Sequence, residues 1–277
     1  MRFGADAERF LAPGCERIVT LAGLLAARKL PYTVIRTATA RHIVLRLGRE
    51  APKLALAAHY DRVAGSPGVL DNSCACLQLV EFAARRSATG ADSLPPLLLL
   101  FTDGEENPAT QGATGQGVYA LAKALAASPA LAPGASLPPV LVLDVTGRGD
   151  RVILSSAPLS LLRRHGLEGG ALAEGHERLR KLAASALRRA GLPAGATVDL
   201  PWSDDLGLIL GGIPALTLSL LPEAELRELP ERRPRTWGFL HGPGDGPELA
   251  EDRSFALISA FLDSLVEEIP EFGRPIR

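Results

Sequence analysis

The chain has 277 residues, of which 47% are hydrophobic, and a formal net charge of −1. It can bury a sizeable core, and its near-neutral charge gives no electrostatic reason to expect nucleic acid or an anionic membrane as a partner. Three cysteines are too few for a disulfide framework and favour a reducing compartment. No stretch resembles a secretion signal, and apolar runs such as 95–101 are far too short to span a bilayer. We therefore expect a cytoplasmic protein.

Short apolar runs alternate with helical patterns along the chain. The first helix is predicted at 6–29, with Asp6 as its cap. The further predicted elements, in chain order, are strands at 42–47 and 53–60, a helix at about 73–88, a strand at 96–102, a helix at 114–127, strands at 139–145 and 151–156, a helix at 174–191, a strand at 213–221 and a helix at 252–269. Segments 128–139, 191–205 and 222–238 are predicted loops. This alternation predicts one α/β domain over 1–277, with helices on both faces of the sheet.

Acidic and histidine residues follow several of the predicted strands. Ligands of open α/β sheets bind outside the carboxyl ends of the strands, so these side chains are expected to meet there. In chain order they are His59 and Asp61, Asp71 in the turn before the next helix, Asp103, Glu105 and Glu106 in "TDGEEN", Asp144, and His241 and Asp245 in "FLHGPGD".

Each of these residues also has an ordinary structural explanation. A lone His after a strand is usually structural, and Asp71 with its two neighbours could cap the following helix. Paired glutamates usually face solvent, and Asp144 could close a turn. Together, however, they would be costly as unpaired charges in an apolar setting, and a bound cation is the simplest way to hold several carboxylates together.

The ligand types suit two ions of the zinc class, which bind imidazole nitrogen and carboxylate oxygen. Two-metal hydrolytic sites hold their ions roughly 3.5–4 Å apart, a distance that one carboxylate can bridge. The five predicted ligands are His59, Asp71, Glu106, Asp144 and His241, with Asp71 as the bridge. Asp61 is then placed to orient the ring of His59, and Glu105 to act as general base on an activated water.

Five blocks of the chain, in order from about residue 41 to 251, resemble the M28 family of zinc aminopeptidases. They are "AHYDRVAGSPGVLDNSCACLQLVEFAAR", "LLLLFTDGEENPATQGATGQGVYA", "VLVLDVTGRGD", "SDDLGLILGGIPALTLS" and "FLHGPGDGPELAE". The resemblance implies an α/β/α sandwich around a mixed, mostly parallel sheet of about eight strands. It also implies that His59 and Asp144 bind one ion, that Glu106 and His241 bind the other, and that Asp71 bridges them.

The chain departs from the family pattern within two of these blocks. Where the family has "DNasG", this chain has "DNSCAC"; Cys74 and Cys76 are interpreted as two small buried residues, with soft-metal binding as the alternative. Where the family has "SDH", this chain has Ser203, Asp204 and Asp205, which places specificity in question more than hydrolysis.

Several further residues are candidates for binding substrate. Asp204 and Asp205 are candidate partners of a substrate amine, and Trp202 and Trp237 either line a specificity pocket or serve packing. Arg62 either contacts a substrate carboxylate or faces solvent. The segment 157–200 and the loop 222–238 are expected to form pocket walls.

The sequence thus predicts a metallo-aminopeptidase that acts on a peptide or small amide with a free N-terminus. Zinc is the expected metal, at two ions per chain, with manganese or cobalt as alternatives. Two alternatives compete with this prediction. One is a single-zinc acyltransferase of the glutaminyl cyclase type, because the segment "PWSDDL" resembles a sequence feature of those enzymes. The other is a catalytically degenerate binding protein of the same fold. Serine hydrolysis is disfavoured because the chain has no G-x-S-x-G motif.

Overall fold

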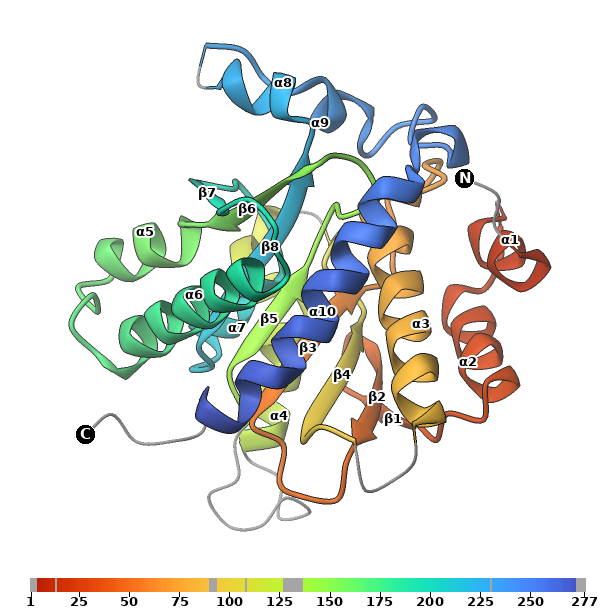
Figure 1. Cartoon of the computed structure of the whole chain (residues 1–277), viewed down its shortest axis with the longest axis horizontal. Helices are drawn as coiled ribbons and strands as arrows, with labels where there is room; N and C mark the ends of the chain where they lie inside the picture. The colour runs from red at the N-terminus through yellow and green to blue at the C-terminus, as the bar shows by residue number, and fades with distance from the viewer. Residues whose placement is uncertain are drawn as a thin grey trace.

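The computed structural model describes residues 4–12, 14–89, 94–107, 109–126, 137–229 and 231–272. Within these ranges, eight strands form one sheet with helices on both faces (Figure 1). The strands are β1 Thr33–Arg36, β2 Arg41–Leu47, β3 Leu54–His59, β4 Leu97–Thr102, β5 Val140–Leu143, β6 Arg151–Ser155, β7 Ala196–Val198 and β8 Ala215–Leu221. The helices are α1 Ala5–Leu11, α2 Arg17–Ala27, α3 Cys74–Ala88, α4 Gly117–Ala126, α5 Ala157–Arg164, α6 Ala171–Arg189, α7 Asp204–Leu210, α8 Glu223–Arg227, α9 Arg235–Phe239 and α10 Asp252–Phe272.

The strand order is β1-β2-β4-β3-β5-β8-β6-β7, and the sheet is mixed. The four central strands β4, β3, β5 and β8 are parallel to one another. The flanking strands β2 and β6 run antiparallel to their central neighbours. The predicted fold class, a sandwich of helices around a mixed, mostly parallel sheet, is confirmed.

The central strand β3 is almost entirely apolar in sequence. All six of its residues are buried, because helices cover both faces of the sheet. Leu54, Leu56 and Ala58 pack into the core on one face, whereas Ala55 and Ala57 pack into the core on the other. Helices α2, α3, α6 and α10 pack in the first core, and α4, α5 and α7 in the second (Figure 1).

Several local predictions are wrong. The helix predicted at 6–29 is divided into α1 and α2, because Ala12 precedes a proline and takes an extended backbone with ψ of 137°. Helix α1 begins at Ala5 after the N-cap Gly4, so Asp6 is not its cap. The predicted loop 191–205 contains β7, and the loop 222–238 contains α8 and α9. Strand β1 and helices α5 and α7 were not predicted, and most of the predicted loop 128–139 lies outside the described residues.

The parallel pairing places the ends of β3, β4 and β5 at one edge of the sheet. His59, the last residue of β3, is in register with Thr102, the last residue of β4. Leu143 ends β5 one residue before Asp144. The polar groups that follow these strands are therefore neighbours.

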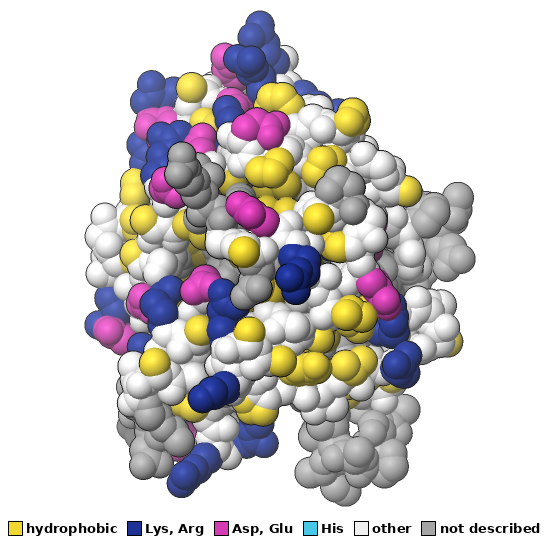
Figure 2. Space-filling model, turned by 90° about the vertical axis from the view of Figure 1, so that its right-hand side faces the viewer, with side chains coloured by type: hydrophobic (Ala, Val, Ile, Leu, Met, Phe, Trp, Pro, Cys, Tyr) yellow, Lys and Arg dark blue, Asp and Glu magenta, His cyan; other side chains and the backbone are white. Residues whose placement is uncertain are grey.

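On the face shown in Figure 2, acidic and basic side chains are interspersed and neither sign gathers into an extended patch. Among the described helices, none combines the length and the apolarity that crossing a bilayer requires.

Candidate metal centre

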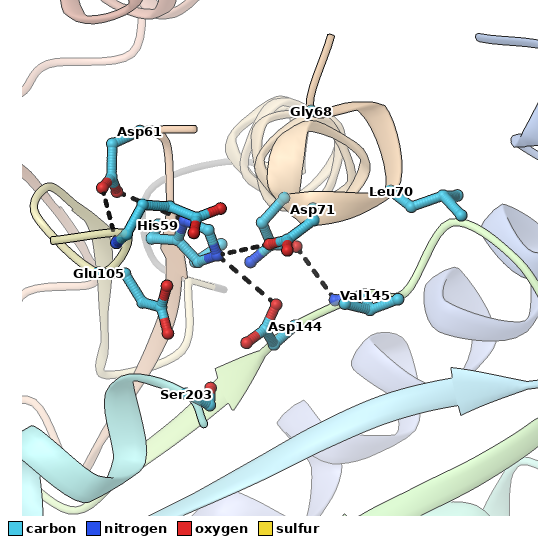
Figure 3. Close-up of polar contacts among 12 residues, drawn as sticks. His59, Asp61, Gly68, Leu70, Asp71, Glu105, Asp144, Val145 and Ser203 are labelled. Carbon is cyan, nitrogen blue, oxygen red and sulfur yellow. Dashed lines mark hydrogen bonds and ion pairs between the residues drawn. The ribbon is translucent and has the colours of Figure 1, made fainter. Parts of the chain in front are cut away.

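The fully buried His59 lies between two carboxylates at the end of β3 (Figure 3). Its Nδ1 atom is 3.4 Å from Oδ1 of Asp61. The second oxygen of Asp61, Oδ2, accepts a hydrogen bond of 3.0 Å from the backbone N–H of Glu106. Asp61 therefore connects the loop after β3 to the loop after β4, and it faces the ring nitrogen of His59 that points away from Asp71.

The carboxylate of Asp71 lies between two histidines that are far apart in the sequence, His59 and His241. Its Oδ1 atom is 3.0 Å from Nε2 of His59, and its Oδ2 atom is 3.0 Å from Nε2 of His241. Each oxygen of one carboxylate thus faces a different imidazole. This arrangement suits a carboxylate that bridges two cations.

Two further carboxylates complete two groups around Asp71. Oδ1 of Asp144 is 3.6 Å from Nε2 of His59, and Oε2 of Glu106 is 3.4 Å from Nε2 of His241. In each group the three candidate ligand atoms lie within 4.8 Å of one another. Ligand atoms of a tetrahedral zinc ion are roughly 3.3 Å apart, so the separations of 3.0–3.6 Å fit a shared ion.

Backbone contacts hold the two ligand-bearing loops in place. Asn72 donates a hydrogen bond of 2.8 Å to the carbonyl oxygen of Leu143 and accepts one of 3.3 Å from the N–H of Val145, so it fixes the backbone on both sides of Asp144. Asp245, four residues after His241, accepts hydrogen bonds from the N–H groups of Leu70 and Asp71.

The charges of the site are unbalanced without a cation. Five carboxylates, those of Asp61, Asp71, Glu105, Glu106 and Asp144, surround only two imidazoles. Ion pairs with histidine cannot neutralise all of them, and uncompensated buried charges are costly. In addition, Nδ1 and Nε2 of His59 and Oδ1 of Asp144 have no hydrogen-bond partner among the described residues. The donor set, the distances and these unpartnered atoms therefore fit a divalent cation of the zinc class.

The ionisation of these groups is strongly coupled to the surrounding charges. Burial disfavours the imidazolium of His59, but the neighbouring carboxylates outweigh it and raise its pKa. The hydrogen bond with Asp71 raises the pKa of His241 to about 9. Burial, followed by the charge of Asp71, raises the pKa of Glu106 to about 8. For Asp71, burial acts in the opposite sense, yet the two imidazoles hold its pKa well below the usual range.

Glu105 is a buried carboxylate beside the two groups, and a neighbour orients it. Burial raises its pKa well above the usual value. Gln116 donates a hydrogen bond of 3.4 Å from Nε2 to Oε1 of Glu105 and another of 3.0 Å to the carbonyl oxygen of Ser203. Oε1 of Gln116 accepts from the backbone N–H of Gly207 at 2.8 Å, which fixes the orientation of the amide.

A cavity of about 320 Å³ opens beside the candidate centre. One end is formed by Asp71, Glu105, Asp144 and His241, and the remainder by apolar and mixed side chains: Val145, Leu200, Pro201, Trp202, Ser219, Arg233, Trp237 and Leu240. Trp202 donates its indole N–H to the carbonyl oxygen of Glu105 at 3.2 Å, so this wall is connected directly to the centre. Both tryptophans proposed from the sequence line the cavity, and the loop 222–238 contributes part of its wall.

Three of the residues considered for substrate binding have other contacts. Asp204 is fully buried and accepts a hydrogen bond of 2.6 Å from the hydroxyl of Thr102, and Asp205 accepts one of 3.1 Å from the N–H of Thr217. Neither aspartate lines the cavity. Arg62 donates hydrogen bonds to the carbonyl oxygens of residues 12 and 67, so it holds two loops together.

The two cysteines near Asp71 are buried in α3. Both are fully buried free thiols, and burial raises the pKa of Cys76 to about 12. The thiol of Cys76 donates to the carbonyl oxygen of His59 at 3.2 Å, which supports the backbone of the candidate ligand. Cys74 meets Gly147 so closely that a Cβ on the glycine would lie 2.5 Å from the sulfur atom. Packing accounts for both residues.

Several residues that support the site had no assigned role in the sequence analysis. Asp245 stood among the polar groups that follow the strands, and Asn72 stood beside Asp71 in the possible helix cap, but the sequence did not indicate the partners of either residue. Gln116 carried no signal beyond its place in the same block as Glu105 and Glu106. Arg17 lies outside every recognised block, yet it is buried and donates a hydrogen bond of 2.5 Å to the carbonyl oxygen of Tyr60.

Comparisons with known proteins identify a matching family model and similar folds. Residues 42–262 match the model of Peptidase family M28. No sequence among the curated proteins matches the chain.

Solved structures with the same fold include both peptidases and cyclases. A leucine aminopeptidase precursor from Bacteroides thetaiotaomicron has a TM-score of 0.67 and 15% identity, with 94% of this chain and 92% of that chain covered. A glutaminyl cyclase from the same organism has a TM-score of 0.66 and 17% identity, covering 94% and 93%. A Zn-dependent exopeptidase from Parabacteroides distasonis has a TM-score of 0.63 and 14% identity, covering 95% and 94%.

Proposed function

From the premise that this chain belongs to peptidase family M28, we propose that it is a zinc-dependent aminopeptidase. It would hydrolyse the N-terminal bond of a peptide or small amide. The observation that carries this proposal is the position of Asp71, whose two oxygens each lie 3.0 Å from a different histidine. A one-ion site has no need for a second complete ligand group, whereas a two-ion hydrolytic site does.

Five side chains would hold the ions. His59 and Asp144 belong to one ion, Glu106 and His241 belong to the other, and Asp71 serves both. When bound, zinc supplies Lewis-acid polarisation of the scissile carbonyl and lowers the pKa of water. Asp61 would keep the ring of His59 in the orientation that presents Nε2 to the site, because it faces Nδ1 at 3.4 Å.

Glu105 would move the proton in the reaction. It lies at the end of the cavity beside Asp144, and it is buried but in contact with the cavity. A carboxylate there can accept a proton from the attacking water and return it to the leaving amine, which is the work of a general base and then a general acid. Gln116 holds the carboxylate by one oxygen at 3.4 Å and leaves the other oxygen for the proton.

The experiment that tests the proposal combines metal analysis with cleavage. Gently purified protein is analysed for metal per chain, and a panel of aminoacyl-amides is assayed before and after chelation and re-addition of zinc. Two equivalents of zinc with chelator-sensitive cleavage would support the proposal. Metal-free protein that remains inactive with added zinc, manganese or cobalt would instead indicate a binding protein of the same fold.

A second candidate, glutaminyl cyclisation, is favoured by two tryptophans in the cavity wall and by cyclases among the similar structures. An N-terminal Gln would then close on its own amine and release ammonia. The two activities are separated by incubating a Gln-initiated peptide and measuring ammonia and the free amino acid. Ammonia without a free amino acid, at one zinc per chain, would replace the aminopeptidase assignment.

A further inference from the structure

Arg233 contributes a cationic group to the wall of the cavity, whereas the candidate centre contributes acidic groups. It lies just before α9, in the segment that leads away from β8 across α8 (Figure 1). Its Nη2 atom donates a hydrogen bond of 3.0 Å to the carbonyl oxygen of Trp237, and both residues line the cavity. This bond holds the guanidinium close to the indole-bearing turn.

The guanidinium of Arg233 has no acidic partner in the described part of the chain. Among the residues that the structure describes, no carboxylate lies within 4.0 Å of it. Two other arginines of the same segment differ in this respect: Arg232 is 3.6 Å from Glu228, and Arg227 pairs with Glu223. The hydrogen bond to Trp237 uses one of the five N–H donors of the side chain, so a planar anionic group can still bind to the others.

Once metal is bound, the net charge of the cavity depends on Arg233. This dependence rests on the proposed two-ion function. Two divalent cations would balance the carboxylates of Asp71, Glu105, Glu106 and Asp144, whereas the fifth carboxylate of the centre, Asp61, faces Nδ1 of His59 and does not line the cavity. Arg233 then leaves the cavity with an excess of positive charge. Such a cavity attracts a ligand that carries an anionic group.

We propose that the cavity selects short peptides that carry a carboxylate, which Arg233 binds while the reacting amide lies at the acidic end. Guanidinium and carboxylate form paired, charge-assisted hydrogen bonds, and these bonds discriminate strongly against an amide in the same place. The volume of about 320 Å³ is at the small end of the range for ligand cavities, which favours short peptides. The carboxylate can be the C-terminus of a dipeptide or the side chain of its first residue.

Intrinsic fluorescence measures binding to this cavity directly. The chain contains two tryptophans, and both line the cavity. The probes are three dipeptide analogues with a reduced, uncleavable peptide bond: Leu-Leu with a free C-terminal carboxylate, the same compound as its C-terminal amide, and Glu-Leu as its C-terminal amide. Each is titrated into zinc-loaded protein, and the Kd is taken from the change in tryptophan emission.

The wild-type protein is expected to bind at least one carboxylate-bearing probe about tenfold more tightly than the neutral amide. Arg233→Ala should abolish this preference without weakening the neutral amide, and Arg233→Lys should restore part of it. Arg232→Ala is the matched control, because Arg232 is adjacent and exposed but does not line the cavity. A preference for the Leu-Leu acid alone would identify a dipeptide substrate, and one for the Glu-Leu amide alone would identify an acidic first residue.

Equal binding of all three probes, no fluorescence change with any of them, or an unchanged preference in Arg233→Ala would overturn the inference. These outcomes are separate from a failure of the proposed function, because the titration requires no cleavage. If the protein binds the acidic probe through Arg233 but cleaves no peptide, carboxylate recognition stands and peptidase activity does not. If it cleaves aminoacyl-amides without any carboxylate preference, peptidase activity stands and carboxylate recognition does not.

Discussion

Asp245 accepts a hydrogen bond of 3.2 Å from the backbone N–H of Asp71, across 174 residues of sequence. The same carboxylate accepts a second bond, of 2.7 Å, from the N–H of Leu70. These bonds connect the loop that carries His241 to the turn that carries the shared carboxylate of the candidate centre. The distance between the two histidine groups is thereby fixed by backbone contacts as well as by any ion that binds there.

Asp245→Ala is expected to weaken metal binding and to destabilise the fold. The change leaves two buried N–H groups without an acceptor, which costs about 2–3 kcal/mol in the free energy of unfolding. Denaturant unfolding and zinc titration measure the two effects. Asp263→Ala, which removes an exposed ion pair with Arg85, is the control and should change neither. Zinc affinity equal to that of the wild type would show that Asp245 does not position Asp71.

Glu105→Gln is expected to retain metal and to lose turnover by about 10²–10⁴-fold, since the amide cannot accept the proton. The measurement is kcat alongside zinc per chain. Glu81→Gln, at an exposed ion pair with Arg28, is the matched surface control. Full activity in Glu105→Gln would remove Glu105 from the mechanism.

Gln116→Leu is expected to lower kcat about tenfold and to leave KM and zinc content nearly unchanged, because it removes a donor to Glu105 without touching a candidate ligand. Gln116→Glu keeps the size of the side chain but places a second carboxylate against Glu105, and it should be at least as harmful. Steady-state kinetics of both variants test this. A rise in KM with normal kcat would indicate that Gln116 shapes the substrate cavity instead.

Zinc binding is expected to release protons and to weaken as the pH falls. The pKa of Glu106 is raised to about 8, first by burial, and that of His241 to about 9, first by its hydrogen bond with Asp71. At pH 7 both groups are therefore mostly protonated, and zinc must displace those protons. Calorimetric titrations at pH 7 in buffers of different ionisation enthalpy count them. Binding enthalpies that do not depend on the buffer would contradict this expectation.

Asp205→Asn is expected to make stability less dependent on pH. Burial raises the pKa of Asp205 to about 7, whereas an unfolded aspartate titrates near about 3.9. Between these values the native state binds more protons than the unfolded state, so its stability decreases as the pH rises. Asparagine cannot ionise, so between pH 5 and pH 8 the variant should gain about 3 kcal/mol of stability relative to wild type. The same difference in the free energy of unfolding between variant and wild type at pH 5 and at pH 8 would refute the raised pKa of Asp205.

The elements were predictable where one local pattern dominates. The apolar run before His59 and the helical period that includes Phe261 and Leu265 produce β3 and α10 close to the predicted limits. The short strand β1 was missed because its residues are mostly exposed and lack an alternating pattern. The first helix was predicted too long because the helical pattern of apolar residues continues past Ala12, whereas the helical conformation of the backbone ends there.

The sequence by itself determined which polar residues stand at strand ends, because the lengths of the apolar runs specify where each buried strand stops. It also predicted a shared cation, since His59, Asp71, Glu106, Asp144 and His241 are costly as separate buried charges.

Only the tertiary structure decided the partner of each group. It directed the two oxygens of Asp71 to different histidines, buried Asp204 against Thr102 away from the cavity, and brought Gln116 to Glu105. The physical reason is that strand ends follow from local patterns of hydrophobicity. Contacts between distant loops depend instead on how the whole sheet and its helices pack.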